Sequence, residues 1–289
     1  MKKVLILAAV IAAISIVLTG CAKKQADDGK FKVGVSMPTK SLQRWNQDGA
    51  NMKSQLEAAG YVVDLQYGGE NEIPVQVSQI ENMIQGGCKA LVIAAIDGSS
   101  LTNVLKEAKT KGVKIIAYDR LIMNSDAVSY YATFDNYKVG QFQGQFLADK
   151  LGLGSSSGPY NIELFTGAPD DNNVNFFFGG AMDVLTPYID AGKLKVLSGQ
   201  TTKAQCATQN WSTEESQKRM ENLVTSQKYG PSGTNLDAVL SSNDSVANGI
   251  TNALVGAGYN KDNFPVLTGQ DCDLPSVKNM LAGLQTMSV

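Results

Sequence analysis

Polar and aromatic side chains of a few kinds fall just after short apolar runs in this 289-residue chain. Examples are Asp119-Arg120 and Asn243-Asp244, and the only two tryptophans are Trp45 and Trp211. Carboxylates accept hydrogen bonds, guanidinium groups donate them in a fixed fork and amides do both, so such a set suits neighbouring hydroxyl groups. Flat aromatic rings cover apolar C–H faces. These residue types favour binding of a compound with a hydroxyl rim and apolar faces, such as a pyranose.

The polar set is drawn from both halves of the chain. It comprises Lys40, Gln43, Arg44, Asp97, Asp119, Arg120, Asp135, Asn136, Asp170, Asp171, Asn172, Asn173, Asn243, Asp244, Gln270 and Asp271. Any single member also fits an ordinary loop, because aspartate and asparagine favour turns. Their repeated position after apolar runs favours one shared site over many unrelated loops.

Catalysis has little support in the residue types. The absence of histidine excludes mechanisms that need an imidazole, but it leaves carboxylate chemistry open. Asp170-Asp171 and Asp271–Asp273 could suggest a glycoside hydrolase, yet sequence neighbours do not define the spacing across a scissile bond. The glycine-rich stretch 152–158 lacks the ending of a phosphate loop, and no stretch has the calcium-loop pattern. We expect no enzyme activity, no catalytic residue, no metal and no cofactor.

Nine short apolar runs alternate with amphipathic helical stretches. The runs are 31–37, 61–66, 90–95, 113–118, 130–134, 160–165, 194–198, 237–240 and 265–268. This alternation predicts an α/β protein with doubly wound parallel sheets, and nine strands are too many for one small sheet. Gly60 and Gly112 stand where helices should end. Ligands of such sheets bind beyond the carboxyl ends of the strands, where the polar set lies.

The amino terminus has the pattern of an export signal. Met1-Lys2-Lys3 precedes an apolar run at 4–18, which ends in Leu18-Thr19-Gly20-Cys21. This ending resembles a lipobox, in which the cysteine is acylated. We expect a signal peptide over 1–20, lipidation of Cys21 and a tether over 21–30. The protein would then be exported and lipid-anchored at the outer face of the cytoplasmic membrane or in the periplasm. A plain signal anchor is the alternative.

Charge and cysteine content exclude further classes. The formal net charge is -2 and no basic run is present, so we expect no nucleic-acid partner. Beyond the lipobox, the remaining cysteines are Cys88, Cys206 and Cys272. Their odd number argues against a complete disulfide framework, and their spacing matches no zinc site. Cys88 is expected to be a small core residue.

Several stretches resemble the periplasmic sugar-binding proteins of the ribose, xylose and galactose class, which are type I periplasmic binding proteins. They are Arg44-Trp45, 78–84, Ala117–Arg120, Thr133–Asn136, Pro169–Asn173, Leu185–Asp190, Ser242–Asp244 and Gly269–Asp271. The resemblance runs from about Lys32 to the last residue. It is strongest to the xylose-binding and multiple-monosaccharide-binding members of the class.

The resemblance implies two α/β domains joined by a multi-strand hinge that closes on a sugar. The implied domains are 31–135 plus 270–289, and 136–269. The implied ligand-binding residues are Arg44, Trp45, Arg120, Asp171, Asn173, Trp211, Asn243 and Asp271. Asn136 and Gln270 would belong to the hinge, and Asp119 would position Arg120. Relatives continue past Val289, which implies that this chain lacks an edge strand and a helix of the first domain.

The resemblance also implies a role. The chain would be a monomer that binds a free monosaccharide of the xylose, glucose, galactose or arabinose type. It would deliver this sugar to the permease of an ABC transporter. A sensory role beside a chemoreceptor or a histidine kinase remains an alternative. The runs Asp170–Asn173 and Tyr118–Ile122 favour broad specificity, and the identity of the sugar stays open.

Overall fold

The computed structural model describes residues 29–155 and 158–289. The predicted signal peptide, Cys21 and most of the predicted tether lie outside the described residues. Within the described part of the chain, no helix has the length and apolar character needed to cross a membrane. Cys88, Cys206 and Cys272 are free, and Cys88 lies in the core as predicted.

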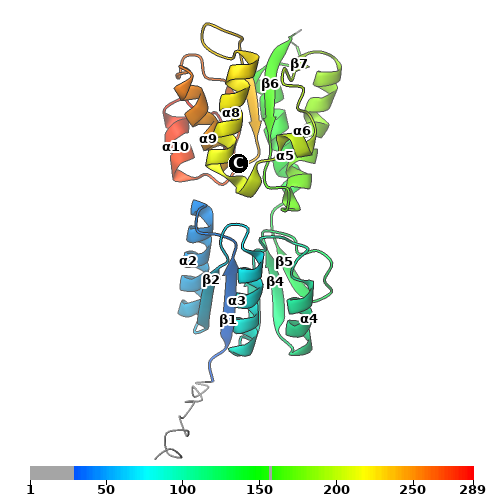
Figure 1. Ribbon diagram of the computed structural model, residues 1–289, viewed down its shortest axis with the longest axis vertical. Coiled ribbons are helices and arrows are strands. Elements are labelled where there is room, and N and C mark those ends of the chain that lie inside the picture. Colours follow the sequence, from blue (N-terminus) through cyan, green and yellow to red (C-terminus); the bar gives the residue numbers. More distant parts are fainter. Residues whose placement is uncertain (1–28, 156–157) are drawn as a thin grey trace, which may run out of the picture. The chain divides into compact units, whose positions relative to one another are not determined.

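The first sheet has five parallel strands in the order β2-β1-β3-β4-β5 (Figure 1). They are β1 (Lys32–Met37), β2 (Val62–Tyr67), β3 (Ala90–Ile93), β4 (Lys114–Tyr118) and β5 (Val128–Ala132). The helices between them are α2 (Gln43–Ala58), α3 (Ile73–Gln85) and α4 (Thr102–Thr110). This strand order places a topological switch point between β1 and β3, where loops on opposite faces diverge. We call this sheet with its helices the first lobe.

Apolar side chains cover both faces of the first sheet. Trp45 on α2 packs with Val35 on one face, while Ile80 on α3 and Leu105 on α4 pack with Leu91 on the other. Gly60 and Gly112 follow α2 and α4 with φ of 92° and 75°, so they end these helices as predicted. The first sheet is therefore doubly wound.

The second sheet has four parallel strands in the order β7-β6-β8-β9. They are β6 (Tyr160–Phe165), β7 (Leu194–Lys195), β8 (Ala238–Ser241) and β9 (Val266–Leu267). The accompanying helices are α5 (Asn136–Lys150), α6 (Asn173–Asp190), α7 (Lys203–Cys206), η1 (Gln209–Trp211), α8 (Thr213–Gln227), α9 (Asp244–Gly256) and α10 (Leu274–Leu281). Its switch point lies between β6 and β8. We call this sheet with its helices the second lobe.

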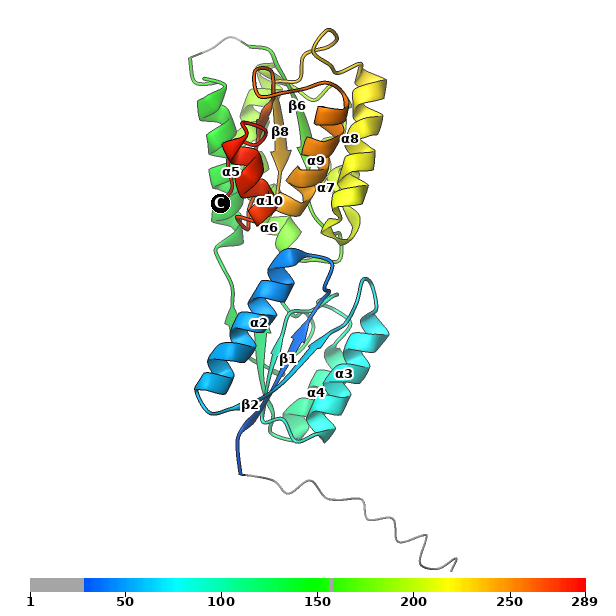
Figure 2. The same ribbon diagram turned by 90° about the vertical axis from the view of Figure 1, so that its left-hand side faces the viewer.

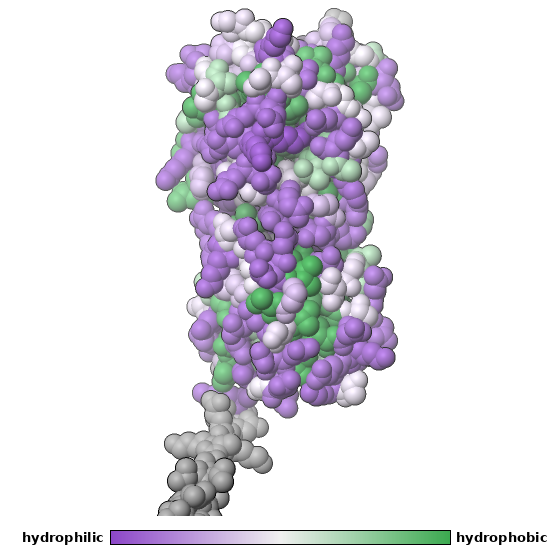
Figure 3. All heavy atoms as spheres, viewed as in Figure 1, coloured by the Kyte–Doolittle hydropathy of each residue, from purple (hydrophilic) through white to green (hydrophobic). Residues whose placement is uncertain are grey.

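The second lobe is also covered on both faces. Leu147 of α5 and Leu185 of α6 pack in one core cluster, and Met220 of α8 and Ile250 of α9 pack in another. Figure 2 shows these two helix pairs on opposite sides of the sheet. On the face seen in Figure 3, hydrophilic side chains predominate, and apolar ones gather over part of the first lobe.

All nine predicted strands are present, and eight of them differ from their predicted bounds by one to three residues at one or both ends. β5 starts and ends two residues earlier than predicted, and β7 is shorter than its predicted run. Both are edge strands with a single neighbour, so only one side of their backbone is held by a ladder. At β7 the apolar pattern of the sequence exceeds the length of chain that is paired, whereas β5 keeps its predicted length in a shifted position.

The chain passes from the first sheet to the second through residues 133–135. Among residues 31–155 and 158–289 this is the single passage, so the multi-strand hinge implied by the resemblance is represented here by one segment. The predicted domain limits placed 270–289 with the first domain, and the structure places α10 and the segment after it on the second lobe. The reason is local pairing: Thr286 and Val289 donate backbone hydrogen bonds to Leu267 and Gly269.

Two helices of the second lobe approach closely because glycine lies at their contact. A Cβ added to Gly140 of α5 would lie 2.1 Å from the carbonyl oxygen of Phe177 on α6. Gly179 of α6 has no atom within 4 Å of an added Cβ. The two glycines are therefore a matched pair within helices: Gly140 is constrained by packing against α6, and Gly179 is not.

We predict that Gly140→Ala lowers the free energy of unfolding by about 1–3 kcal/mol, because α5 must move away from α6. Gly179→Ala should leave stability unchanged or raise it by up to about 1 kcal/mol, because alanine is the better helix former. Urea unfolding followed by circular dichroism measures both changes. Equal effects of the two substitutions would contradict the close contact.

Candidate ligand-binding site

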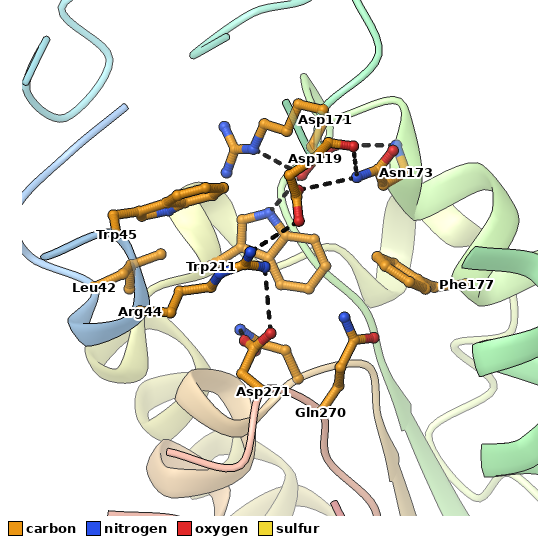
Figure 4. Close-up of a pocket in the computed structure, with 12 residues that line it drawn as sticks. Leu42, Arg44, Trp45, Asp119, Asp171, Asn173, Phe177, Trp211, Gln270 and Asp271 are labelled. Atoms are coloured by element: carbon orange, nitrogen blue, oxygen red, sulfur yellow. Dashed lines mark hydrogen bonds and ion pairs between the residues drawn. The ribbon is translucent and has the colours of Figure 1, made fainter. Parts of the chain in front are cut away.

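A narrow cavity of about 30 Å³, partly open to solvent, lies between the two lobes (Figure 4). The residues that line it are Leu42, Arg44, Trp45, Asp119, Arg120, Asp171, Asn173, Phe177, Trp211, Asn243, Gln270 and Asp271. The structure thus brings together all eight residues of the predicted ligand-binding set. We call this the first cavity.

The strand ends of both sheets supply these side chains. Arg44 and Trp45 follow β1 at the start of α2, whereas Arg120 follows β4. In the second lobe, Asp171 follows β6, and Asn243 follows β8 as the N-cap of α9. β1, β6 and β8 flank the two switch points, so the cavity occupies the position at which open α/β sheets bind ligands.

Arg44 is the centre of an ionic network that joins the lobes. Its Nη2 lies 2.9 Å from Oδ2 of Asp48 and 2.9 Å from Oδ2 of Asp119, both in the first lobe. Its Nη1 lies 3.4 Å from Oδ1 of Asp271 in the second lobe. Burial by itself lowers the pKa of Arg44, but the three carboxylates outweigh it and raise that pKa above the usual value. Arg44 therefore stays charged.

Arg120 makes a second ionic contact between the lobes. Its Nε lies 3.0 Å from Oδ2 of Asp171, and both side chains are largely buried. Its Nη1 donates to the carbonyl oxygens of Ala95 and Ile96 at 3.0 and 3.3 Å. Burial raises the pKa of Asp171, and Arg120 partly counteracts this. A fixed donor and a fixed acceptor thus face the cavity together.

Asp119 is held in an unusual backbone conformation by several hydrogen bonds. Its φ is 60°, and the backbone N–H of Arg120 donates across it to Tyr118 at 2.6 Å, which is the pattern of a γ-turn. Its carbonyl oxygen accepts from Tyr131, Thr133 and Asn173 at 3.0, 2.9 and 3.1 Å. Asn173 belongs to the second lobe, so this turn is also an interlobe contact.

The aromatic walls of the cavity come from Trp45, Phe177 and Trp211. Arg44 and Arg120 lie over the Trp45 ring with Cζ 4.4 and 5.4 Å from its centroid. Trp211 is packed edge-to-face against Phe177 at 6.1 Å, and its Nε1 donates to Oδ2 of Asp171 at 3.2 Å. Both indoles are therefore fixed by charged neighbours as well as by packing.

Gly167 makes room for the Trp211 indole. A Cβ added to Gly167 would lie 2.1 Å from Cζ2 and 2.2 Å from Cη2 of that ring. The loop after β6 thus passes directly against the indole, and only glycine permits this approach. The sequence analysis missed this role, because nothing in the run Thr166-Gly167 indicates what packs on it.

Left-handed backbone is concentrated at this site. Among the described residues, eight other than glycine have positive φ, and three of them, Asp119, Trp211 and Asp271, line the first cavity. Such conformations cost on the order of 1–3 kcal/mol each and persist only where the surroundings enforce them. Their concentration at one cavity supports a functional role that is independent of any family resemblance.

Two buried residues behind the cavity hold its loops in place. Gln143 of α5 donates from Nε2 to the carbonyl oxygens of Ser242 and Gly269, at 3.1 Å each. Asp244 accepts hydrogen bonds from the backbone of Asp273 and from Gln285 and Ser288. These contacts fix the loops that carry Asn243 and Asp271. Gln143 and Asp244 themselves do not line the cavity.

The structure adds residues to the predicted site in several places. Asp119 was expected to position Arg120, and it also lines the cavity and pairs with Arg44. Gln270 was assigned to the hinge, and it also lines the cavity. Phe177 was missed, although it stands four residues after Asn173 on α6 and so shares its face. Leu42 was also missed.

Other members of the polar set lie elsewhere. Lys40, Gln43, Asp97, Asp135, Asn136, Asp170, Asn172 and Asp244 do not line the first cavity. Asn136 begins α5 and donates to Thr133 at 3.4 Å, directly at the passage between the lobes. Within the described ranges, no group of three or more histidine, cysteine, aspartate or glutamate side chains has metal-site geometry.

Comparison with known proteins assigns the chain to a family. Residues 33–289 match the family described as periplasmic binding protein domain. A multiple sugar-binding periplasmic protein of Azospirillum brasilense is 51% identical over 276 residues, which cover 95% of this chain and 76% of the relative. The D-xylose-binding periplasmic protein of Escherichia coli is 38% identical over 275 residues, with coverages of 95% and 76%.

A solved structure is similar as well. The solute-binding protein of an ABC transporter from Clostridium phytofermentans, with bound β-D-glucose, is 60% identical and superimposes with a TM-score of 0.85. The match covers 89% of this chain and 78% of that one. The chain belongs to the periplasmic binding protein family. The predicted family and the predicted α/β fold class are therefore confirmed.

Asp271 gives the stability of this protein a specific dependence on pH. Burial raises its pKa to about 7, from an unperturbed 3.8, although Arg44 counteracts the shift. Because the folded pKa lies above the unfolded one, folding takes up a proton here. The resulting stabilisation is complete below pH 3.8 and is lost as the pH rises to about 7.

We predict that Asp271→Asn makes the decline in unfolding free energy between about pH 4 and 7 shallower, because the asparagine does not titrate. Urea unfolding at several pH values measures this slope. Asp262→Asn, at an exposed position outside the cavity, is the control and should leave the slope unchanged. An unaltered slope in Asp271→Asn would contradict the raised pKa.

We predict that Gly167→Ala displaces the Trp211 indole, because the added methyl group overlaps the ring. Trp45 and Trp211 are the only tryptophans, so intrinsic fluorescence should shift in wavelength or intensity. Gly230→Ala, where an added Cβ meets nothing within 4 Å, is the matched control. Identical spectra for the wild type and both variants would show that Gly167 does not position Trp211.

Proposed function

We propose that this chain binds a free monosaccharide in the first cavity and serves as the solute-binding component of an ABC importer. The observation that carries the proposal is the composition of the cavity, which combines two indoles with arginine, aspartate and asparagine from both lobes. The relatives described as multiple sugar-binding and D-xylose-binding proteins support it. So does the related structure with bound β-D-glucose.

The chemistry of the cavity fits a neutral sugar. Arg44 and Arg120 supply donors, and Asp119, Asp171 and Asp271 supply acceptors, so neighbouring hydroxyls can both donate and accept. Trp45, Trp211 and Phe177 supply apolar surface for the C–H faces of the ring. A hydroxyl buried without a partner costs about 1–3 kcal/mol, so this balance of donors and acceptors selects for polyhydroxyl compounds.

Gln270 adds an acceptor that the sugar would satisfy. Its Oε1 is buried and has no hydrogen-bond partner among the described residues. In Figure 4 its amide points into the cavity between Phe177 and Asp271. A hydroxyl of the bound sugar would give this oxygen its partner, so we add Gln270 to the proposed ligand-binding residues.

The binding mechanism we propose is closure of the two lobes around the sugar. The contacts Arg44–Asp271, Arg120–Asp171 and Asn173–Asp119 join the lobes at the cavity. A ligand that contacts residues of both lobes stabilises the closed form relative to any open one, and so shifts the equilibrium. The segment 133–135, with Asn136 and Gln270 beside it, would accommodate the motion.

The protein would bind its sugar without converting it. Asp119, Asp171 and Asp271 are the carboxylates that line the cavity, and each pairs with Arg44 or Arg120. Glycoside hydrolysis needs two carboxyl groups placed across the scissile bond, one of them a proton donor. Paired carboxylates are better suited to accept hydrogen bonds from hydroxyls.

We propose that the protein is exported and attached to the membrane through acylated Cys21, as a monomer. The lipobox-like sequence Leu18–Cys21 supports anchoring. Relatives are described as periplasmic, which supports export. Two acyl chains give stable attachment, whereas a single chain gives only reversible binding.

Isothermal titration with glucose, galactose, xylose, arabinose and ribose tests the function. We predict binding of at least one of the five and a loss of at least about tenfold in affinity for Arg120→Ala, because a charged hydrogen bond in a buried site is worth about 1.5–3 kcal/mol. Lys111→Ala, which removes an exposed surface ion pair, should leave affinity unchanged. No binding of any of the five would refute the proposal.

A further inference from the structure

Asp48 stands next to the ligand site without lining the first cavity. It follows Arg44 by four positions on α2, so the two side chains share a face of the helix. Its Oδ2 accepts a hydrogen bond from Nη2 of Arg44 at 2.9 Å. Both side chains are largely shielded from solvent, with exposed fractions of 17% for Arg44 and 25% for Asp48. The function proposed above gives Asp48 no role.

The stability of helix α2 does not account for this pair. Arg44 lies in the first turn, where the helix dipole opposes a positive charge, and no acidic residue offsets it in that turn. The order of the pair is also the weaker one, because the dipole favours an acidic residue four positions before a basic one. Arg44 is therefore badly placed for the helix itself, which points to a use at the cavity.

Asp48 provides the shorter of two hydrogen bonds that hold the Arg44 guanidinium. Arg44 donates to Asp48 at 2.9 Å and to Asp271 at 3.4 Å, while its approach to Asp119 is an ion pair. In Figure 4 the guanidinium reaches between Asp119 and Asp271. Since Asp271 belongs to the second lobe, it can hold Arg44 only when the lobes are together. Asp48 is on the same helix as Arg44, so its hydrogen bond is available in every arrangement of the lobes.

Tyr118, at the end of β4, fixes Asp48 in turn. Its hydroxyl donates to the same Oδ2 at 3.2 Å. Burial and the Asp48 carboxylate raise the pKa of Tyr118 to about 12, so its hydroxyl keeps its proton at neutral pH and remains a donor. The contacts thus run from the first sheet through Asp48 to Arg44, and of these three residues only Arg44 lines the cavity.

We propose that Asp48 is a positioning residue for sugar binding, which together with Tyr118 holds the Arg44 guanidinium in the orientation that donates to a sugar hydroxyl. This inference rests on the proposed function, because it requires a sugar in the first cavity. An arginine side chain loses conformational freedom when it binds a ligand, and a hydrogen bond that orients it beforehand removes part of that cost. Asp48 and Tyr118 would not touch the sugar.

Titration calorimetry of the full chain with glucose, galactose, xylose, arabinose and ribose tests the inference. Asp48→Asn keeps the size of the side chain and removes its charge, so it should weaken the binding of whichever sugar binds by at least about fivefold. Glu57→Gln is the matched control, because Glu57 pairs with Lys53 over the same spacing on the same helix but is exposed. This control should leave the affinity unchanged.

The outcomes separate the inference from the proposed function. If the wild type binds a sugar and Asp48→Asn binds it with the same affinity, the inference is overturned and the proposed function stands. If the wild type binds none of the five sugars, the proposed function itself fails.

Monodeoxy analogues of the sugar that binds distinguish positioning from a general loss of structure. The analogue that lacks the hydroxyl bound by Arg44 should respond neither to Arg44→Lys nor to Asp48→Asn, whereas the other analogues should respond to both. If Asp48 only stabilises the fold, Asp48→Asn weakens the binding of every analogue equally. That result would contradict a role through Arg44.

A double variant tests the contribution of Tyr118. Tyr118→Phe removes the hydroxyl that bonds to Asp48, and it should weaken sugar binding by about twofold. Added to Asp48→Asn, it should cause no further loss, because the hydroxyl acts through that carboxylate. Additive losses in the double variant would show that Tyr118 acts independently of Asp48.

Discussion

Two guanidinium groups buried between two lobes are the constraint on which this structure depends. Arg44 and Arg120 come from the first lobe, and Asp271 and Asp171 come from the second to meet them. A buried charge is tolerated only when it is paired and its remaining hydrogen bonds are satisfied. The lobes must therefore meet with these side chains in register. The parallel sheets serve this purpose, since their strand ends bring the required loops to one place.

The loops around these charges are held more rigidly than ordinary loops. Asp119 keeps a left-handed conformation because three donors, one of them on the other lobe, bond its carbonyl oxygen. Gln143 and Asp244 fix the loops after β8 and β9 from behind. A site positioned in this way loses little conformational entropy when a ligand binds. Strain and buried polar contacts thus serve the same end, which is a preformed set of donors and acceptors.

Much of this could be predicted from the sequence, for physical reasons that differ between elements. Apolar runs located every strand, and strand ends located the polar site residues. Phe177 was missed because an aromatic residue within a largely apolar helix looks like core. The role of Gly167 and the contact of Asp119 with Arg44 were missed because they depend on what the fold brings against these residues. The segment after α10 was misplaced because its pairing with β9 is not encoded in its own pattern.

The ionic network also sets what a ligand must do to bind. A hydroxyl that approaches Arg44 or Arg120 meets a guanidinium that already has carboxylate partners, so it gains only the difference between the two sets of hydrogen bonds. Each charged hydrogen bond therefore contributes less than it would from an unpaired guanidinium, although removing the donor altogether still leaves a buried hydroxyl unsatisfied at a cost of about 1–3 kcal/mol. The larger gain comes from apolar surface that the indoles and Phe177 remove from water. In such a site the polar residues decide which hydroxyl arrangement is accepted, and the aromatic walls supply most of the affinity.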